Sequence, residues 1–341
     1  MAAPPDLAAP DTRALAAALE AALRASGDAR RVARLERRPS AYRSSFALEE
    51  LDVALDDGAA LALVLKRVDR AALSDSAHRA KPAFLSHPAR EPDVYRLLLA
   101  PAALGTARCF AVASSGAPHA WLLLERVPGV ELYQVGRLQT WEQVARWLAR
   151  LHLRFAADAR AGTLPASLLR YDRAFLELWS ARAAARADRF APSRTQRAAL
   201  GRLLDRYGDV VERLLALPPT LIHGECYASN VLVQPTPAGL RVCPIDWEMA
   251  AVGPGLVDLA ALVAGGWQAA QRRRIADAYH AELCALGADA PRAEQLLADL
   301  DRCRLHLALQ WIGWADDWTP PPQHAHDWLA DALALGARLL R

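Results

Sequence analysis

The amino-acid sequence predicts an α+β protein with two lobes, a small β-rich first lobe and a larger helical second lobe. Residues 31–127 contain short alternating or apolar runs separated by turn residues, a pattern typical of strands. From residue 128 onward, apolar residues recur mostly at helical spacing, with one polar hairpin embedded among them. Strands followed by helices favour an α+β arrangement, here with an extension (1–30), a first lobe (31–127) and a second lobe (128–341).

The extension is expected to form an amphipathic helix that starts near Asp11 or Thr12. It lacks the basic start and the compact apolar stretch of a secretory signal peptide. No part of the chain reaches the ~18 uninterrupted apolar residues that span a bilayer, so no membrane partner is expected.

Five strands and one helix are predicted in the first lobe. Three antiparallel strands lie in RVARLERR, FALEELDVAL and ALALVLKRV, and Asp56-Asp57-Gly58 is a hairpin signal between the last two. A helix follows in HPAREPDVYRLLLAPAAL, where Pro92 suits the first helical position. CFAVASS and AWLLLERV then read as two further strands.

The second lobe is predicted to be mainly helical. Helical patterns occur in TWEQVARWLARLHLRFAADAR, over residues 171–216, and from about residue 256 to a final helix that begins at Asp327. Between them, LIHGECYASNVLV and LRVCPIDWEMA predict a strand, a polar loop, a strand, a turn and a strand.

Composition bears on the class of protein and its surroundings. A chain of 341 residues with 53% hydrophobic residues can bury a sizeable core. Its formal net charge is +3 without a run of five like charges, so it shows no electrostatic footprint for nucleic acid. The five cysteines lack a CxxC pair, which favours a reducing cytoplasm. Lys66 and Lys81 are the only lysines, and nothing indicates an oligomeric state.

The most specific motif lies between His223 and Asp258. It reads H-G-E-C-Y-A-S-N, then I-D-W-E and D-L-A, with 16 positions from Asn230 to Asp246. The sequence has no P-loop, no G-x-G-x-x-G after the first strand, no G-x-S-x-G elbow and no H-E-x-x-H. The motif resembles the catalytic core of the aminoglycoside phosphotransferase and choline kinase family. Over most of the chain, this resemblance implies a bilobal protein-kinase-like fold and ATP-dependent phosphoryl transfer.

The resemblance assigns Asn230 and Asp246 to Mg²⁺. An amide oxygen and a carboxylate suit this hard cation, and both flank one hairpin. Glu225 stands where the family has its catalytic Asp, which orients the acceptor hydroxyl and can take its proton. The side chain is longer by one methylene, so three readings stay open: a working base, a supporting residue, or the mark of an inactive kinase.

Three other residues of the motif have expected supporting roles. His223 is expected to orient the catalytic loop, with a satisfied core histidine as the alternative. Asp258 is expected to brace the same loop through hydrogen bonds. Glu248 follows Asp246 by two residues, so on a strand both would face the same side. Glu248 would then add charge near the metal or the acceptor, or pair with a nearby arginine.

The nucleotide side centres on Lys66, which ends an apolar strand. In kinase-like folds the corresponding lysine pairs with phosphates and with a helix glutamate; an exposed strand-end lysine is the alternative. Glu91, four residues before Tyr95, is the expected partner, and Asp93 is the second choice.

Two further segments are expected to contact the nucleotide. Ser44, in the glycine-free loop of residues 40–45, would cover the phosphates. Glu125 and Val127, in the segment that joins the lobes, would contact adenine through their backbone.

The acceptor is expected to be a hydroxyl of a small molecule: a sugar, an aminoglycoside, an amino alcohol or a natural product. A peptide serine or threonine is also possible. A Trp-rich late segment could line the acceptor pocket or simply belong to the core; it contains Trp311, Trp314, Asp316, Asp317, Trp318, His324 and Trp328. The rival to an active enzyme is a nucleotide-binding pseudokinase with a regulatory or scaffold role.

Overall fold

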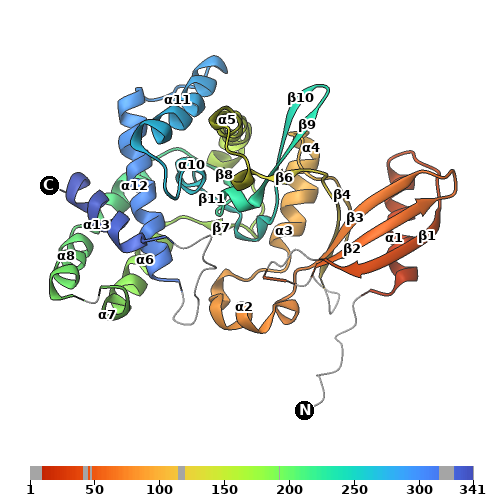
Figure 1. The fold of residues 1–341 in the computed structure, drawn as a ribbon, viewed down its shortest axis with the longest axis horizontal. Coiled ribbons are helices and arrows are strands. Elements are labelled where there is room, and N and C mark those ends of the chain that lie inside the picture. Colours follow the sequence, from red (N-terminus) through yellow and green to blue (C-terminus); the bar gives the residue numbers. More distant parts are fainter. Residues whose placement is uncertain are drawn as a thin grey trace, which may run out of the picture.

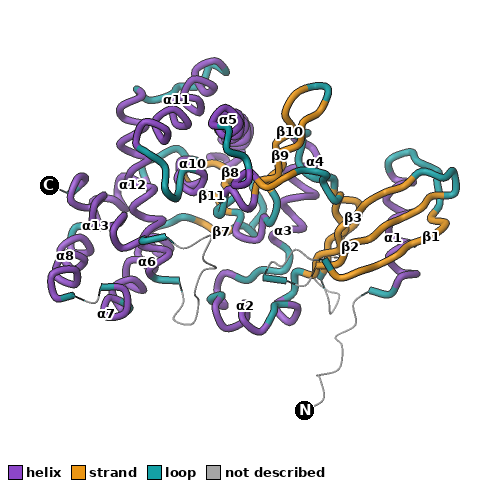
Figure 2. Tube along the Cα trace, viewed as in Figure 1, coloured by secondary structure: helices purple, strands orange, loops and turns teal. Residues whose placement is uncertain are grey.

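The computed structural model describes residues 10–40, 45–46, 48–113, 120–191, 193–314 and 326–340. Figure 1 shows a β-rich lobe beside a larger helical lobe, and Figure 2 shows the same separation of strands from helices. The predicted α+β bilobal fold is confirmed. Several residues singled out above lie outside the described residues: Ser44, Asp316, Asp317, Trp318 and His324.

The first lobe contains a five-stranded sheet in the order β1-β2-β3-β5-β4. Its strands are β1 (Val32–Pro39), β2 (Leu48–Leu55), β3 (Ala60–Arg67), β4 (Cys109–Ala113) and β5 (Trp121–Glu125), and each is antiparallel to its neighbours. The predicted hairpin turn is confirmed, because Gly58 adopts φ +86° and its N–H donates to the Leu55 carbonyl at 3.0 Å.

Helix α1 (Thr12–Ala25) covers one face of this sheet (Figure 1). It begins after Asp11, whose carboxylate accepts from the Ala14 N–H at 2.7 Å, as the sequence predicts. Its buried leucines recur every four residues, and they pack on alternate residues of β2, β3 and β5; the cluster is Leu15, Leu19, Leu23, Leu51, Val53, Leu55, Leu63, Leu65 and Leu123. The other residues of these strands, including Val64 and Lys66, therefore face away from α1.

A helical segment between β3 and β4 joins the sheet to the second lobe. It comprises a 3₁₀ turn (Arg70–Ala72), α2 (Asp75–Ala80), a second 3₁₀ turn (Ala83–Leu85), α3 (Arg90–Asp93), a π-helical stretch (Val94–Leu99) and α4 (Ala100–Ala102). The prediction that Pro92 opens the helix was wrong, because α3 begins at Arg90. Proline is tolerated there because the first-turn N–H groups have no helical partner.

The second lobe is built around nine helices of the described chain. They are α5 (Leu138–Ala161), α6 (Arg173–Ala185), α7 (Ala187–Phe190), α8 (Arg194–Asp205), α9 (Tyr207–Leu215), α10 (Leu256–Leu262), α11 (Ala269–Ala285), α12 (Ala293–Ile312) and α13 (Trp328–Leu339). The helical stretch predicted for residues 171–216 is thus divided among α6 to α9. None of the helices in the described residues has both the length and the apolar character needed to cross a membrane.

Two small sheets of the second lobe carry the predicted polar hairpin. One has the order β10-β9-β6 and the other the order β7-β11-β8. Their strands are β6 (Val130–Glu131), β7 (Leu169–Arg170), β8 (Pro219–Ile222), β9 (Val231–Thr236), β10 (Gly239–Pro244) and β11 (Ala251–Pro254). The motif loop runs from β8 to β9, and the I-D-W-E segment follows β10, so both ends of the motif meet at one end of the β9–β10 hairpin.

Candidate active site

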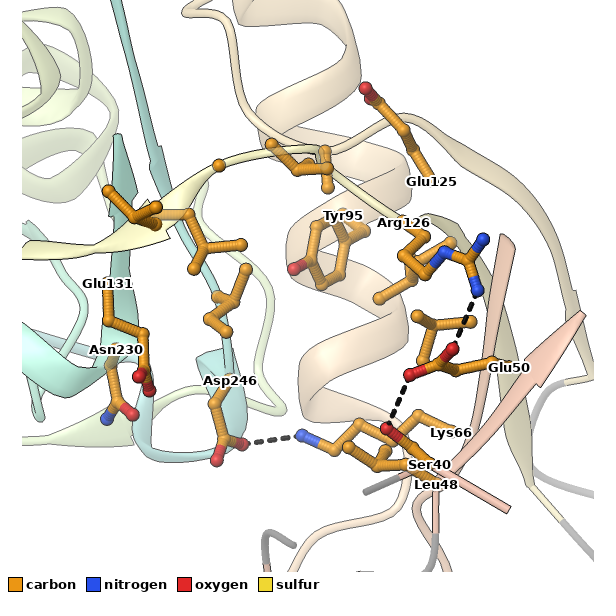
Figure 3. Close-up of a pocket in the computed structure, with 18 of the residues that line it drawn as sticks. Ser40, Leu48, Glu50, Lys66, Tyr95, Glu125, Arg126, Glu131, Asn230 and Asp246 are labelled. Atoms are coloured by element: carbon orange, nitrogen blue, oxygen red, sulfur yellow. Dashed lines mark hydrogen bonds and ion pairs between the residues drawn. The ribbon is translucent and has the colours of Figure 1, made fainter. Parts of the chain in front are cut away.

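A cavity of about 400 Å³ lies between the sheet of the first lobe and the β9–β10 hairpin (Figure 3). Its apolar wall comes from both lobes and includes Leu48, Val64, Ala107, Leu124, Val127, Val130, Leu232 and Ile245. Its polar residues include Ser40, Glu50, Lys66, Glu91, Glu125, Arg126, Glu131, Gln134, Asn230 and Asp246. This one cavity is therefore lined by six site residues predicted from separate parts of the sequence: Lys66, Glu91, Glu125, Val127, Asn230 and Asp246.

Lys66 lies between two carboxylates at the closed end of this cavity. Its Nζ is 2.5 Å from Asp246 Oδ1 and 2.7 Å from Glu91 Oε2, and Lys66 is only 5% exposed. Burial lowers the pKa of Lys66, but the charges of Asp246 and Glu91 outweigh it and leave that pKa above its ordinary value. Of the two helix acids considered, Glu91 contacts Lys66, whereas Asp93 accepts from the Ser167 hydroxyl at 2.7 Å.

Asp246 has a backbone conformation that L-residues rarely adopt, with φ +65° and ψ +60°. Such strain costs about 1–3 kcal/mol and is found mainly at functional sites. Burial raises the pKa of Asp246, but the Lys66 ammonium outweighs burial, so the pKa lies below its ordinary value and the group is an anion.

Asn230 presents an amide oxygen to the same region. Its Nδ2 donates to the Glu225 carbonyl at 3.0 Å, and since a carbonyl only accepts, the amide oxygen must point the other way. Figure 3 shows this amide and the Asp246 carboxylate on the same side of the cavity. One amide oxygen and one anionic carboxylate are a donor set that suits Mg²⁺, which usually completes its shell with water and phosphate oxygens.

The motif loop between β8 and β9 is held by a buried carboxylate. Asp258 is fully buried and accepts from the His223 N–H at 2.7 Å and the Gly224 N–H at 2.9 Å. His152 Nε2 lies 3.2 Å from the same carboxylate. The loop can approach this closely because Gly224 has φ +84°, and a Cβ there would lie 2.3 Å from the Met249 carbonyl oxygen.

The His223 ring is committed to structural hydrogen bonds. Its Nε2 lies 2.8 Å from the Ile245 carbonyl, and its Nδ1 lies 3.3 Å from the Glu225 N–H. A neutral ring with the proton on Nε2 satisfies both partners, and burial lowers the pKa of His223 and so favours that neutral form. This geometry favours an orienting role for His223.

Glu225 lies on the loop between β8 and β9, and its carbonyl also accepts from the Tyr227 N–H at 2.7 Å. Burial, together with the charge of Glu248, raises the pKa of its carboxyl to about 8, although the charge of Lys81 opposes both. Glu225 is therefore largely protonated at neutral pH.

The expectation that Glu248 and Asp246 face the same side of a strand was wrong. Trp247–Met249 forms a 3₁₀ turn, and the left-handed Asp246 before it turns the two side chains toward different partners. Glu248 forms an ion pair with Lys81, and no arginine side chain among the described residues pairs with it. An arginine does reach the backbone here, because Arg90 Nη1 donates to the Glu248 carbonyl at 2.7 Å.

Sequence reasoning missed Lys81 and Arg90. Arg90 is 3% exposed and also donates to the carbonyls of Leu85 and Ser167, so it ties α3 to the second lobe. The only sequence signal for Lys81 was its rarity, as one of two lysines in the chain.

The Trp-rich segment is part of an aromatic cluster beside the catalytic loop. Trp311 Nε1 donates to the Tyr227 hydroxyl, two residues after Glu225. The Trp311 and Trp328 rings are stacked with centroids 5.6 Å apart, and Trp314 stacks on the fully buried Trp179 at the same distance. Trp314 is buried and Trp311 is half-buried, so the segment belongs partly to the core.

The bilobal fold and this interlobe cavity, with a buried lysine held between two carboxylates, define the class of kinase-like phosphotransferases. A model described as the phosphotransferase enzyme family matches residues 48–306, and the chain belongs to that family. No match was found among curated proteins.

Solved structures with the same fold include small-molecule kinases. A microcompartment-associated aminopropanol kinase is 16% identical, with TM-score 0.55 over 89% of this chain and 90% of its own. A choline kinase from Cryptosporidium parvum is 12% identical, with TM-score 0.54 over 90% and 88%. An aminoglycoside phosphotransferase complex with GDP and kanamycin is 12% identical, with TM-score 0.54 over 91% and 93%. At these identities the likeness establishes the fold.

Proposed function

We propose that this protein is an ATP-dependent O-phosphotransferase that transfers the γ-phosphate to a hydroxyl of a small molecule. The observation that carries this proposal is the position of Lys66, held by Glu91 and Asp246 in a cavity that Asn230 also lines. Phosphoryl transfer requires mainly positioning and neutralisation of charge, and this arrangement supplies a cation and metal-ligand oxygens at one place.

The nucleotide is proposed to enter the interlobe cavity with its base against the apolar wall. The backbone of Glu125 and Val127 would contact adenine, while the Glu125 carboxylate is already occupied by Arg241 at 2.7 and 2.8 Å. Lys66 would then move from Asp246 to the inner phosphates, and Asn230 and Asp246 would hold Mg²⁺. When held by these two residues, Mg²⁺ would supply positive charge to neutralise the charge that develops on the phosphates.

Glu225 is proposed to receive the acceptor proton. The acceptor oxygen forms a bond to the γ-phosphorus while the bond from that phosphorus to the bridging oxygen of ADP breaks. The hydroxyl proton passes to Glu225, and the carboxyl must be ionised for this step. His223 and Asp258 would hold the loop that carries Glu225 without contacting the acceptor.

Hydroxyl compounds that carry an amino group are the first acceptors to test. The solved structures of similar fold include proteins named for aminopropanol and choline and a complex with kanamycin. Stacked indole rings beside the catalytic loop would suit a cationic acceptor. All five cysteines are free, which supports the proposal of a reducing, cytoplasmic setting.

The test measures release of ADP by the purified chain with Mg²⁺ and ATP, and release of GDP with GTP in a parallel arm. The acceptor panel contains aminopropanol, ethanolamine, choline, kanamycin and an uncharged sugar. Turnover with one acceptor is expected, and Asp246→Asn should abolish it. Nucleotide binding in a thermal-shift assay without turnover on a broad acceptor panel would favour the pseudokinase. Absence of nucleotide binding would overturn both.

A further inference from the structure

Lys66 lines the interlobe cavity, and Lys81, the other lysine of the chain, is buried close to it. The sequence has 41 basic lysine and arginine residues, and only Lys66 and Lys81 are lysines. Lys66 is 5% and Lys81 7% exposed, and their Nζ atoms lie 5.5 and 5.8 Å from the centre of the same Phe46 ring. All the other residues in this count are arginines, yet both lysine ammonium groups are buried near the same aromatic ring. Lys66 has a proposed role, whereas Lys81 has none.

The two lysines contact the two acids of the I-D-W-E segment. Lys66 pairs with Asp246 and Lys81 pairs with Glu248. Lys81 directly follows α2, in the first lobe, so its ion pair reaches across the cleft to the second lobe. An ammonium in such an ion pair can exchange its partner for another anion.

Lys81 also lies within electrostatic reach of both proposed reaction partners. Its charge lowers the pKa of Asp246, the proposed metal ligand, and that of Glu225, the proposed base, and at Glu225 it outweighs Lys66. The phosphoryl group must pass from the nucleotide beside Asp246 to the acceptor beside Glu225. The ion pair with Glu248, two residues after Asp246, holds the Lys81 ammonium beside the segment that carries the proposed metal ligand.

The acidic residues of the site favour a second cation near the terminal phosphate of a bound nucleotide. The acidic side chains of Glu91, Glu225, Asp246 and Glu248 gather here, and both ammonium groups are already paired, Lys66 with Glu91 and Asp246 and Lys81 with Glu248. Binding a nucleotide triphosphate adds further negative charge, which Lys66 alone, already shared between Glu91 and Asp246, is poorly placed to offset at the terminal phosphate. A lysine suits this task because its ammonium is a compact point charge with freely rotating donors.

We propose that Lys81 is a catalytic residue that contacts the terminal phosphate, leaving Glu248 when a nucleoside triphosphate binds. This inference rests on the proposed function and adds a second cation to it. Lys66 would contact the inner phosphates, which both the diphosphate and the triphosphate possess. Lys81 would contact only the γ-phosphoryl group and stabilise its charge as it moves to the acceptor oxygen. Lys81 neither gains nor loses a proton in the step.

The two-lysine composition allows a direct test in the unaltered protein. Lysine labelled with ¹³C at Cε should give two resonances, and Lys81→Arg identifies which is which. Mg²⁺ with ADP should shift the Lys66 signal alone, whereas Mg²⁺ with a non-hydrolysable ATP analogue should shift both. A Lys81 signal that responds equally to both nucleotides, or to neither while Lys66 responds, would overturn the inference alone. No response of either lysine, with no nucleotide binding by calorimetry, would overturn the proposed function and with it this inference.

Affinities provide a second measurement with a matched control. Lys81→Met should weaken binding of the ATP analogue about 10- to 100-fold, the usual effect of losing one charge-assisted hydrogen bond, and leave ADP affinity within about threefold. Glu248→Gln removes the same ion pair but retains the ammonium, so it should keep the preference for the analogue. If Lys81 only tied the lobes together, the two substitutions would change both affinities equally.

Discussion

Lys66 Nζ lies 2.5 Å from Asp246 Oδ1, so the proposed phosphate-binding cation pairs with the proposed metal-binding carboxylate. The contact joins β3 of the first lobe to the segment after β10 of the second, which are 180 residues apart in sequence. Each group thus favours the charged form of the other while both are buried.

Lys66→Met is expected to weaken nucleotide binding about 10- to 100-fold, because a charge-assisted hydrogen bond of roughly 1.5–3 kcal/mol is lost. Isothermal titration with ADP and Mg²⁺ measures this. Arg67→Met is the matched control, since it removes a cation from the next residue of β3, which points to the opposite face. Equal losses in both variants would show that Lys66 does not contact the nucleotide.

The pH dependence of catalysis should report Glu225. Its pKa of about 8 means that the base is protonated, and so inactive, below that pH in the free enzyme. We expect kcat/KM to rise with pH and to level off above about pH 8. Glu225→Gln should give a low, flat profile. A wild-type profile that is already level at pH 5 would contradict either the raised pKa or the role as base.

The free energy of unfolding should also depend on Glu225, but it should fall as pH rises, whereas kcat/KM should rise. A carboxyl whose pKa is higher in the folded chain than its ordinary 4.5 favours folding most below pH 4.5, and that contribution is lost as pH rises through about 8. Glu225→Gln, which cannot ionise, should therefore raise the melting temperature, and by more at pH 9 than at pH 5. Calorimetry at the two pH values measures the difference, and an equal shift at both would refute it.

Gly224→Ala and Gly58→Ala separate steric overlap from backbone preference. Both glycines have nearly the same positive φ, +84° and +86°. A Cβ at Gly58 meets nothing within 4 Å, whereas a Cβ at Gly224 would meet the Met249 carbonyl oxygen at 2.3 Å. We expect Gly58→Ala to cost about 1–2 kcal/mol and Gly224→Ala at least about 2 kcal/mol more, by urea unfolding. Similar costs would mean that the loop shifts freely.

Asp258→Asn tests the support of the catalytic loop. The carboxylate accepts from the His223 and Gly224 N–H groups through separate oxygens, whereas an amide has only one accepting oxygen, so one of these bonds is lost and the loop should lose its position. We expect kcat to fall about 10- to 100-fold, on the order of a removed preorganising group, while nucleotide affinity stays within about threefold. Asp299→Asn is the control, since Asp299 is equally buried but pairs with Arg213. Equal losses of kcat in both would indicate general destabilisation.

The sequence predicts local structure well where one pattern decides it. The four-residue spacing of leucines predicts α1, and the Asp-Asp-Gly turn predicts the β2–β3 hairpin. The motif spacing also predicts that Asn230 and Asp246 lie near each other, because a two-stranded hairpin brings its ends together. These are properties of short segments.

Properties that depend on tertiary packing escape such reasoning. The left-handed backbone of Asp246 sends Glu248 to a different partner from the one that strand alternation predicts. Lys81 pairs with Glu248, which lies 167 residues later in the sequence, and no spacing rule predicts that pairing. Pro92 sits within a first turn that begins two residues earlier, because the start of α3 is fixed by contacts of the buried Arg90 and not by local preference.

The leucine stripe of α1 has a practical consequence for anyone shortening the protein. Removing residues 12–25 would leave six apolar side chains of the sheet facing water: Leu51, Val53, Leu55, Leu63, Leu65 and Leu123. A bare apolar sheet face of this kind promotes self-association. Helix α1 thus shields this apolar face and limits self-association of the first lobe. A loss of activity after its removal would then result from aggregation and not from a change in the active site.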